Sequence, residues 1–333
     1  MDRRRAVGIS LVILAAFSFG SASVLARPVY DTGLGWLGLV TWRFIIGAVL
    51  AWTWVAVSPG RRAAVGRLSR RQVAVTIALG ALFTGNAGTY YAALETVPAA
   101  LAGVLVYTYP VMVAVLSIRF ATRLPGRRPW IALILAFGGV VLALGGIDVA
   151  SAPPVDGIVL VVASSVIYSI WIIASARLSG ERQDRLADDV RRPDDSTSDA
   201  AVTTAVMITS SAAVYTLLSV ATGASMDPRA VPVAAWPSVF AIGFLASFLA
   251  IQAFYAGARR VGAAQAALLS TVEPAIIVTL AWIFLGQRLE PIQFVGAGLI
   301  MLSVVVAQTS PRPHGAPEPA MPLEAETPAE DRA

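Results

Sequence analysis

Residues 263–285 read AAQAALLSTVEPAIIVTLAWIFL, an apolar stretch long enough to cross a lipid bilayer as one helix. Glu273 and Pro274 stand side by side near its centre. A carboxylate at membrane depth is costly, so such residues usually face a cavity and serve a function. A proline inside a helix removes one backbone hydrogen bond and loosens the helix around it. The pair therefore predicts a mid-membrane site that binds a ligand and can move.

The composition extends this interpretation to the whole chain. Of 333 residues, 57% are hydrophobic and 14% are charged, and the mean hydropathy is +0.72. Apolar stretches of about 20 residues recur along the sequence, as in a polytopic all-α membrane protein. The 25 basic residues, all arginine, lie mostly between these stretches, so the positive net charge does not indicate a nucleic-acid partner.

The residue types also exclude several chemistries. The chain has no cysteine, and its single histidine is His314 near the C-terminus. Disulfides, thiolate chemistry, zinc sites and histidine-based catalysis inside the membrane are therefore excluded. No phosphate-binding loop of the GxxxxGK[ST] type occurs, which argues against ATP hydrolysis by this chain. We expect no cofactor and no metal.

Ten apolar stretches predict ten transmembrane helices. They lie near residues 6–26, 35–57, 73–93, 98–119, 129–147, 156–176, 201–222, 234–257, 262–285 and 290–308. The first follows a short arginine cluster, but it is too long for a signal peptide. Outside the helices, we expect a polar cytoplasmic loop at 179–200 and a disordered tail at 311–333.

Arginine placement predicts the orientation of these helices. If both termini are cytoplasmic, 21 of the 25 arginines fall in cytoplasmic segments. Only Arg27, Arg229 and Arg288 then lie outside, while Arg43 lies within a helix. The positive-inside rule therefore favours cytoplasmic termini, and we expect a multi-pass protein of the plasma membrane.

The second half of the chain repeats the first. With an offset of 164 residues, 91–143 aligns without gaps on 255–307, and 14 of the 53 positions are identical. Tyr91 then matches Tyr255 and Pro110 matches Pro274. The first helices match more weakly at an offset of 149.

Five helices per repeat means that the second repeat enters the membrane upside down. We therefore predict two inverted five-helix repeats, at 1–150 and 151–310, followed by the tail at 311–333. Inverted repeats are the usual construction of secondary transporters, because two equivalent halves can exchange conformations.

Several motifs resemble those of the EamA type within the drug/metabolite transporter superfamily. They are YYAAL at 90–94, VLVYTYP at 104–110, FYA at 254–256, LSTVEP at 269–274 and FLGQRL at 284–289. The resemblance covers nearly all of 6–308 and implies a ten-helix carrier of small metabolites, often an amino-acid exporter. Members commonly carry a glutamate just after the fourth and ninth helices, where this chain has Arg123 and Gln287. Whatever that glutamate contributes is absent here.

Glu273 and Arg43 are the charged candidates for the site. Glu273 could be a protonatable coupling group or a contact for a substrate ammonium. It could instead be structural, bonded to hydroxyls such as that of Ser270 or paired with Arg43. Arg43 could bind a substrate carboxylate in bidentate fashion, neutralise Glu273, or serve helix packing.

The uncharged candidates could line a substrate cavity or simply join helices by hydrogen bonds. They are Asn86, Tyr90, Tyr107, Gln252, Tyr255 and Gln265. Pro110 and Pro274 occupy equivalent positions, predicted to be mid-helix, and matching breaks in both halves indicate a transport site. A fixed kink that only shapes the bundle is the alternative.

The leading hypothesis is a secondary carrier that exports a small metabolite, with proton coupling through Glu273 left open. One alternative is a non-transporting protein that handles lipid. An intramembrane enzyme is disfavoured because the membrane part offers neither His nor Cys. The expected partners are a small-molecule substrate and the lipid bilayer, not nucleic acid. A homodimer is neither indicated nor excluded.

Overall fold

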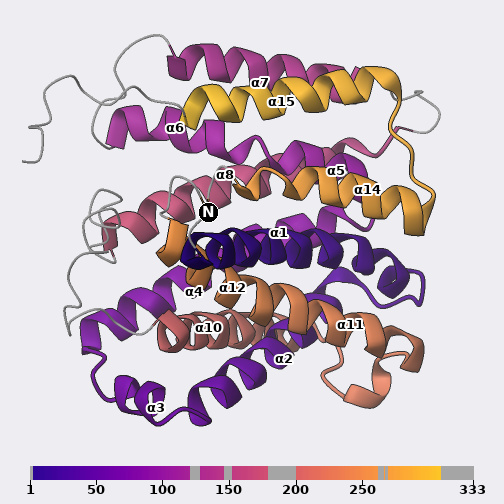
Figure 1. Cartoon of the computed structure of the whole chain (residues 1–333). Helices are drawn as coiled ribbons and strands as arrows, with labels where there is room; N and C mark the ends of the chain where they lie inside the picture. Colours follow the sequence, from indigo (N-terminus) through magenta and orange to yellow (C-terminus); the bar gives the residue numbers. More distant parts are fainter. Residues whose placement is uncertain are drawn as a thin grey trace, which may run out of the picture.

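The computed structural model describes residues 3–120, 128–145, 152–178, 200–261, 266 and 269–308. Within these ranges the chain is helical and contains no strand (Figure 1). Gln265, Arg123, most of the polar loop at 179–200 and the tail at 311–333 lie outside the described residues.

The helices follow the predicted apolar stretches closely. The first half comprises α1 (Arg3–Tyr30), α2 (Trp36–Ala56), α3 (Pro59–Val65), α4 (Arg70–Ala93), α5 (Ala99–Val106), α6 (Tyr109–Phe120) and α7 (Arg128–Gly145). The second comprises α8 (Val155–Leu178), α10 (Ala200–Ala221), α11 (Trp236–Ile242), η4 (Gly243–Leu249), α12 (Ala250–Val261), α14 (Glu273–Leu285) and α15 (Pro291–Gln308). Two short 3₁₀ turns, η2 (Pro228–Ala230) and η3 (Val233–Ala235), precede α11.

Local signals set several helix ends. Ser69 and Gln72 form a reciprocal capping box that starts α4. Glu95, after α4, accepts the backbone N–H of Trp36 at 2.5 Å and so satisfies a free donor at the start of α2. Gly286 ends α14 with φ +64°, a left-handed conformation that glycine adopts at no steric cost.

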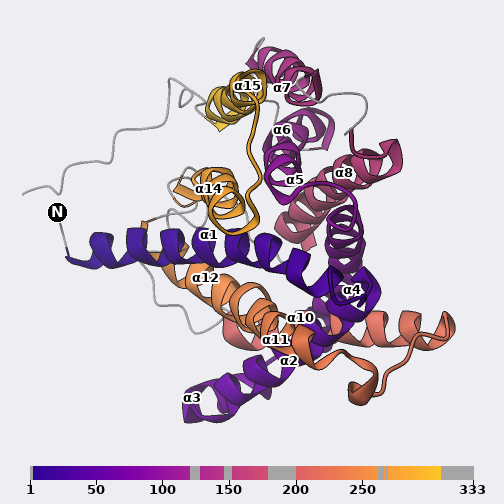
Figure 2. The ribbon, with the colours of Figure 1, turned by 90° about the vertical axis from the view of Figure 1, so that its right-hand side faces the viewer.

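Helices of the first half pack mainly on helices of the second. α1 packs against α12, α4 against α8, α2 against α10, α5 against α14 and α7 against α15. α1 lies between α12 and α14, as both views show (Figures 1 and 2). α8 likewise contacts α4 on one side and α5 and α6 on the other. Each half therefore contributes one central helix to the bundle.

Small residues allow the closest of these contacts. A Cβ added to Gly139 of α7 would lie 2.7 Å from the backbone oxygen of Gly296 in α15. A Cβ on Gly257 of α12 would lie 2.9 Å from the backbone oxygen of Gly8 in α1. Close backbone approach of this kind is typical of helix packing in membranes, where dispersion contacts replace the hydrophobic effect.

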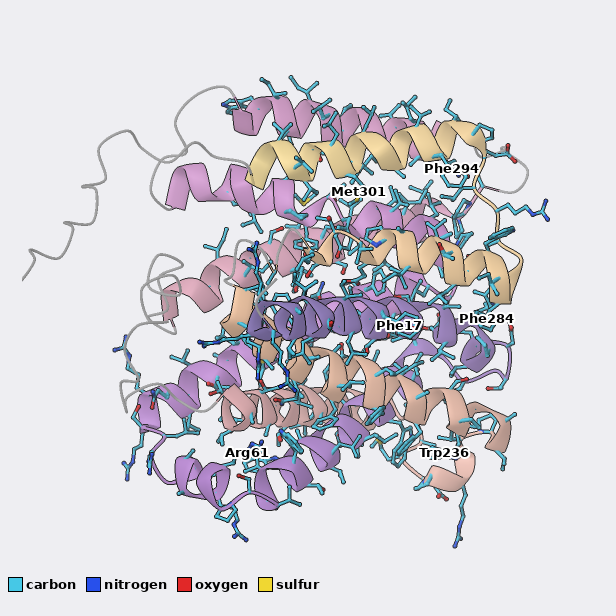
Figure 3. The ribbon with its side chains drawn as sticks, viewed as in Figure 1. Phe17, Arg61, Trp236, Phe284, Phe294 and Met301 are labelled. Atoms are coloured by element: carbon cyan, nitrogen blue, oxygen red, sulfur yellow. The ribbon has the colours of Figure 1, made fainter. Side chains whose placement is uncertain are left out.

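Large apolar side chains cover the outside of the bundle. Ile134 and Phe137 of α7 are each 70% exposed. Phe284 of α14, labelled in Figure 3, is 73% exposed. Among the described residues, six helices are long and apolar enough to cross a membrane. Four shorter apolar helical stretches lie at Ala99–Val113, Trp130–Ala143, Glu273–Leu285 and Pro291–Val306. An apolar exterior over helices of this length suits a lipid environment.

Candidate functional site

Two helix breaks lie at equivalent places in the two halves. Tyr107 and Thr108 form the turn that separates α5 from α6, and Thr271 and Val272 form the turn before α14. The two turns are 164 residues apart, the same offset that aligns the repeats in the sequence. We call them the first break (107–108) and the second break (271–272).

The position predicted for the two prolines is corrected by these breaks. Pro110 and Pro274 are not in the middle of a helix but at the second residue of α6 and of α14. Proline is well tolerated in the first turn, where its backbone nitrogen needs no intrahelical partner. Each proline therefore follows a two-residue turn between two helical segments of one apolar stretch.

Both breaks leave backbone carbonyls that need partners from elsewhere. Because Pro110 has no N–H, the carbonyl of Val106 loses its usual helical donor, and the hydroxyl of Ser165 in α8 donates to it at 3.1 Å. The hydroxyl of Ser169, one turn further along α8, lies 3.0 Å from the carbonyl of Tyr109 and 2.7 Å from that of Ser165 in its own helix. The first break is thus bonded to α8 at two points.

A residue of the first break supplies the hydrogen-bond donor that the second break lacks. Pro274 deprives the carbonyl of Ser270 of its helical donor, and the hydroxyl of Tyr107 donates to that carbonyl at 2.5 Å. The same hydroxyl lies 3.1 Å from Oε2 of Glu273, so its single proton is shared between the two oxygens. Tyr107, at the end of α5, therefore joins the two breaks directly.

Glu273 is partly buried and occupies the first residue of α14. The N-terminal end of a helix carries partial positive charge, which favours a carboxylate there. Together with the Tyr107 hydroxyl, this location holds Glu273 beside the second break.

Arg43 of α2 is 4% exposed and lies against the π-helical segment η4. Its Nε donates to the hydroxyl of Ser247 at 3.2 Å. Its guanidinium carbon lies 4.5 Å from the ring centre of Phe44 and 4.4 Å from that of Tyr91. Gly47 allows this contact, since a Cβ there would lie 2.5 Å from that of Ser247. The cation is therefore held by a hydroxyl and two aromatic faces.

Arg43 and Glu273 do not pair with each other. In the described part of the chain, the ion pair within 4.0 Å is that of Arg27 and Asp31, at 2.9 Å. The alternative in which Arg43 neutralises Glu273 directly is therefore wrong for this structure. The two ionisable side chains instead stand apart inside the bundle.

A chain of aromatic rings connects the surroundings of these two charges. Tyr107 contacts Tyr109 with ring centres 5.5 Å apart, and Tyr109 contacts Tyr168 of α8 at 4.7 Å. Tyr168 contacts Phe83 of α4 at 6.4 Å, and Phe83 contacts Phe44 at 6.2 Å. The rings are mostly edge to face, as aromatic pairs prefer.

The remaining predicted residues have varied surroundings. Nδ2 of Asn86 donates to the Ser164 hydroxyl at 2.9 Å, and the Tyr90 hydroxyl donates to that of Ser23 at 3.1 Å. Both bonds join helices, which fits the packing alternative. Gln252 is partly buried, and Tyr255 is 36% exposed.

Sequence reasoning missed several residues at this site, among them Ser165, Ser169, Tyr168 and Phe83. The spacing of the two serines, four residues apart on one helix face, is the signal that could have found them. The π-helix η4 was also unforeseen, since its sequence resembles an ordinary apolar helix. Within the described ranges, no cluster of three or more His, Asp or Glu residues could hold a metal.

Apolar helices, an apolar exterior and ionisable side chains inside the bundle define an α-helical integral membrane protein. The chain belongs to the EamA-like transporter family, whose model matches residues 6–145 and again residues 195–309. A protein of known crystal structure, 20% identical, has the same fold with a TM-score of 0.58. That similarity covers 91% of this chain and 96% of the other. No curated protein matches this sequence.

Proposed function

We propose that the protein is a secondary carrier that exports a small amphiphilic metabolite bearing both an ammonium and a carboxylate group, as amino acids do. The observation that carries this proposal is the separation of Arg43 from Glu273 inside the bundle. A buried charge without an opposite charge is costly, so a ligand that supplies both missing charges would bind favourably.

In this proposal each group of the substrate has a matching contact. The substrate carboxylate faces the Arg43 guanidinium, which can donate two parallel hydrogen bonds to it. The substrate ammonium faces Glu273 and the nearby tyrosines. The rings between the two charges accept the apolar part of the molecule.

The packing pattern supports alternating access by two inverted halves of five transmembrane helices each. Exchanging equivalent helices turns the pair α1–α12 into α8–α4, and both pairs are present (Figure 2). The pairs α2–α10 and α7–α15 each map onto themselves. Such a pattern is expected of two repeats related by a pseudo-twofold axis. Arginine placement favours both termini on the cytoplasmic face of the plasma membrane.

The substrate class is tested by thermal unfolding of the purified protein with a panel of common amino acids. A ligand that binds only the native state raises the unfolding midpoint. The best binder is then compared with two analogues, one lacking the carboxylate and one lacking the ammonium. Both analogues should bind more weakly. If every amino acid leaves the midpoint unchanged, the proposed substrate class is wrong.

Coupling to protons is tested at Glu273, which we propose as the protonated group. Proteoliposomes with an imposed pH gradient should accumulate the identified substrate, and Glu273→Gln should abolish the dependence on the gradient. Glu290→Gln removes an exposed carboxylate outside the site and serves as the matched control. Gradient-driven transport that persists in Glu273→Gln rules out this coupling role, and absence of saturable flux in the unaltered protein favours the lipid-handling alternative.

A further inference from the structure

The connection between α2 and α4 carries a concentrated positive charge. Residues 58–71, here called the elbow, contain Arg61, Arg62, Arg67, Arg70 and Arg71. No aspartate or glutamate occurs anywhere between residues 32 and 94. Across the described ranges, none of these arginines has a carboxylate within 4.0 Å. The charge of the elbow is therefore not neutralised by neighbouring side chains.

Arg61 differs from the other four arginines of the elbow because its contacts are within the protein and stabilise the elbow itself. Its Nη1 donates to the carbonyl of Trp54 at 3.1 Å, near the C-terminal end of α2. Its guanidinium carbon also lies 4.0 Å from the centre of the Trp54 ring. A cation at the carbonyl end of a helix is favoured by the helix dipole. This contact fixes where the elbow leaves α2.

The backbone of the elbow is helical or hydrogen-bonded in turns along most of its length. The helix α3 begins at Pro59, and a turn follows in which the N–H of Arg67 donates to the carbonyl of Ala64 at 3.2 Å. The capping box of Ser69 and Gln72 then starts α4. Ala64 and Leu68 pack against the core of the bundle, which leaves the arginine side chains on the outer side.

The remaining four arginines are exposed: Arg62, Arg67, Arg70 and Arg71. Arg70 and Arg71 occupy the first turn of α4, where the helix dipole disfavours positive charge. A residue that lowers the stability of its own helix indicates a functional role when no neighbouring group offsets that cost. An anion placed between these side chains would remove the conflict.

Apolar and aromatic groups flank the same arginines. Trp54 is 41% exposed, Val57 is 65% exposed and Val65 is 37% exposed. Tryptophan beside apolar residues at a helix end is typical of the boundary between the acyl chains and the headgroups. The elbow thus presents arginines, which suit a charged headgroup, beside apolar side chains, which suit the acyl chains of the same lipid.

We propose that the elbow is a docking surface for anionic phospholipid, with Arg62, Arg67, Arg70 and Arg71 contacting the phosphodiester headgroups. Basic clusters next to a transmembrane helix bind acidic lipids through summed charge attraction. This inference does not depend on the identity of the transported substrate.

The experiment uses the full chain in a neutral detergent with phosphatidylglycerol or phosphatidylcholine of identical acyl chains. Native mass spectrometry counts bound lipid, and the unfolding midpoint measures stabilisation. We expect phosphatidylglycerol to bind preferentially and to raise the midpoint, with an effect that declines at high salt. The double variant Arg70→Gln/Arg71→Gln should bind phosphatidylglycerol about tenfold or more weakly.

The matched control is Arg229→Gln/Arg288→Gln, which removes two exposed arginines elsewhere on the chain. This variant should retain the binding of the unaltered protein. In phosphatidylcholine both variants should keep the original midpoint, which shows that they fold. Equal loss in both variants, or equal binding of the two lipids, overturns the proposal. Inorganic phosphate that reproduces the full stabilisation also overturns it, because the site would then bind a soluble anion.

Discussion

The two helix breaks share a sequence offset and a proline, but different parts of the protein hold them. At the first break, Ser165 and Ser169 of α8 donate to the carbonyls of Val106 and Tyr109. At the second break, the carbonyl of Ser270 receives the hydroxyl of Tyr107. The first break is therefore hydrogen-bonded to the central helix α8. The second break is hydrogen-bonded to the first break.

The repeat explains why the second break lacks an equivalent anchor. At the offset of 149 residues, Ser165 and Ser169 of α8 correspond to Ala16 and Gly20 of α1. Neither residue has a hydroxyl, although α1 packs against α14 as α8 packs against α6. A Cβ on Gly20 would lie 3.1 Å from Ile276, so this contact is an apolar one. α1 therefore offers the second break no hydroxyl at the positions where α8 serves the first.

The largest effect is expected from removing both anchors of the first break. Ser165→Ala/Ser169→Ala leaves two carbonyls without their donors from α8, which should lower the free energy of unfolding by about 2 kcal/mol. Unfolding in mixed micelles measures this difference. The control Ala16→Ser adds a hydroxyl at the repeat-equivalent position of α1 and should not destabilise. Equal stability of the double variant and the unaltered protein contradicts the anchoring role.

A smaller effect is expected at the second break. Tyr107→Phe removes the hydroxyl that serves both Ser270 and Glu273, at a cost of about 1 kcal/mol. Because this hydroxyl joins the two breaks, the variant should also change the rate of substrate flux. Flux assays in proteoliposomes and unfolding in micelles test the two effects separately. Tyr215→Phe is the matched control, since that buried hydroxyl donates to the carbonyl of Thr84 at 2.6 Å and not to either break.

The two prolines test whether the breaks begin helices or bend them. Pro110→Ala and Pro274→Ala should each change the unfolding free energy by less than about 1 kcal/mol, since proline is tolerated in the first turn. A proline in a helix interior would instead give a gain of about 3 kcal/mol on substitution. The unfolding free energies of both variants in micelles distinguish a first-turn proline from a helix-interior one. A large gain at either position restores the mid-helix interpretation.

The smallest effect is expected at Gln287, which joins the far ends of the same helices. Its Oε1 accepts the backbone N–H of Ala100 at 3.2 Å, in the first turn of α5. Gln287→Glu places a full negative charge at this helix start and should stabilise by about 0.5 kcal/mol. The unfolding midpoint measures this change, with Gln287→Ala as the variant that loses the acceptor. A destabilised glutamate variant argues against the capping role.

Much of the fold was predictable from the sequence, because apolar length and arginine placement report directly on a membrane environment. The apolar stretches at 6–26 and 35–57 correspond to α1 and α2 within a few residues. The prolines correctly predicted where two helices are interrupted. They did not predict that a helical segment starts one residue before each proline. The difference arises because the turn before each proline depends on donors from other helices.

The candidate site was less predictable. Glu273 and Arg43 stand out as charges in apolar stretches, yet the sequence allowed them to pair, and the structure separates them. Ser165 and Ser169 read as ordinary helix residues until the carbonyls they serve are known. Tyr168 and Phe83 join the aromatic chain only because α8 and α4 pack together.

The sequence by itself determined that this is a helical membrane protein with a repeated organisation, because hydropathy and repeated residues are properties of the chain alone. The tertiary structure alone decided which donor satisfies each exposed carbonyl and which charge lies near which ring. Those partners come from helices far apart in the sequence, and only packing brings them within hydrogen-bonding distance.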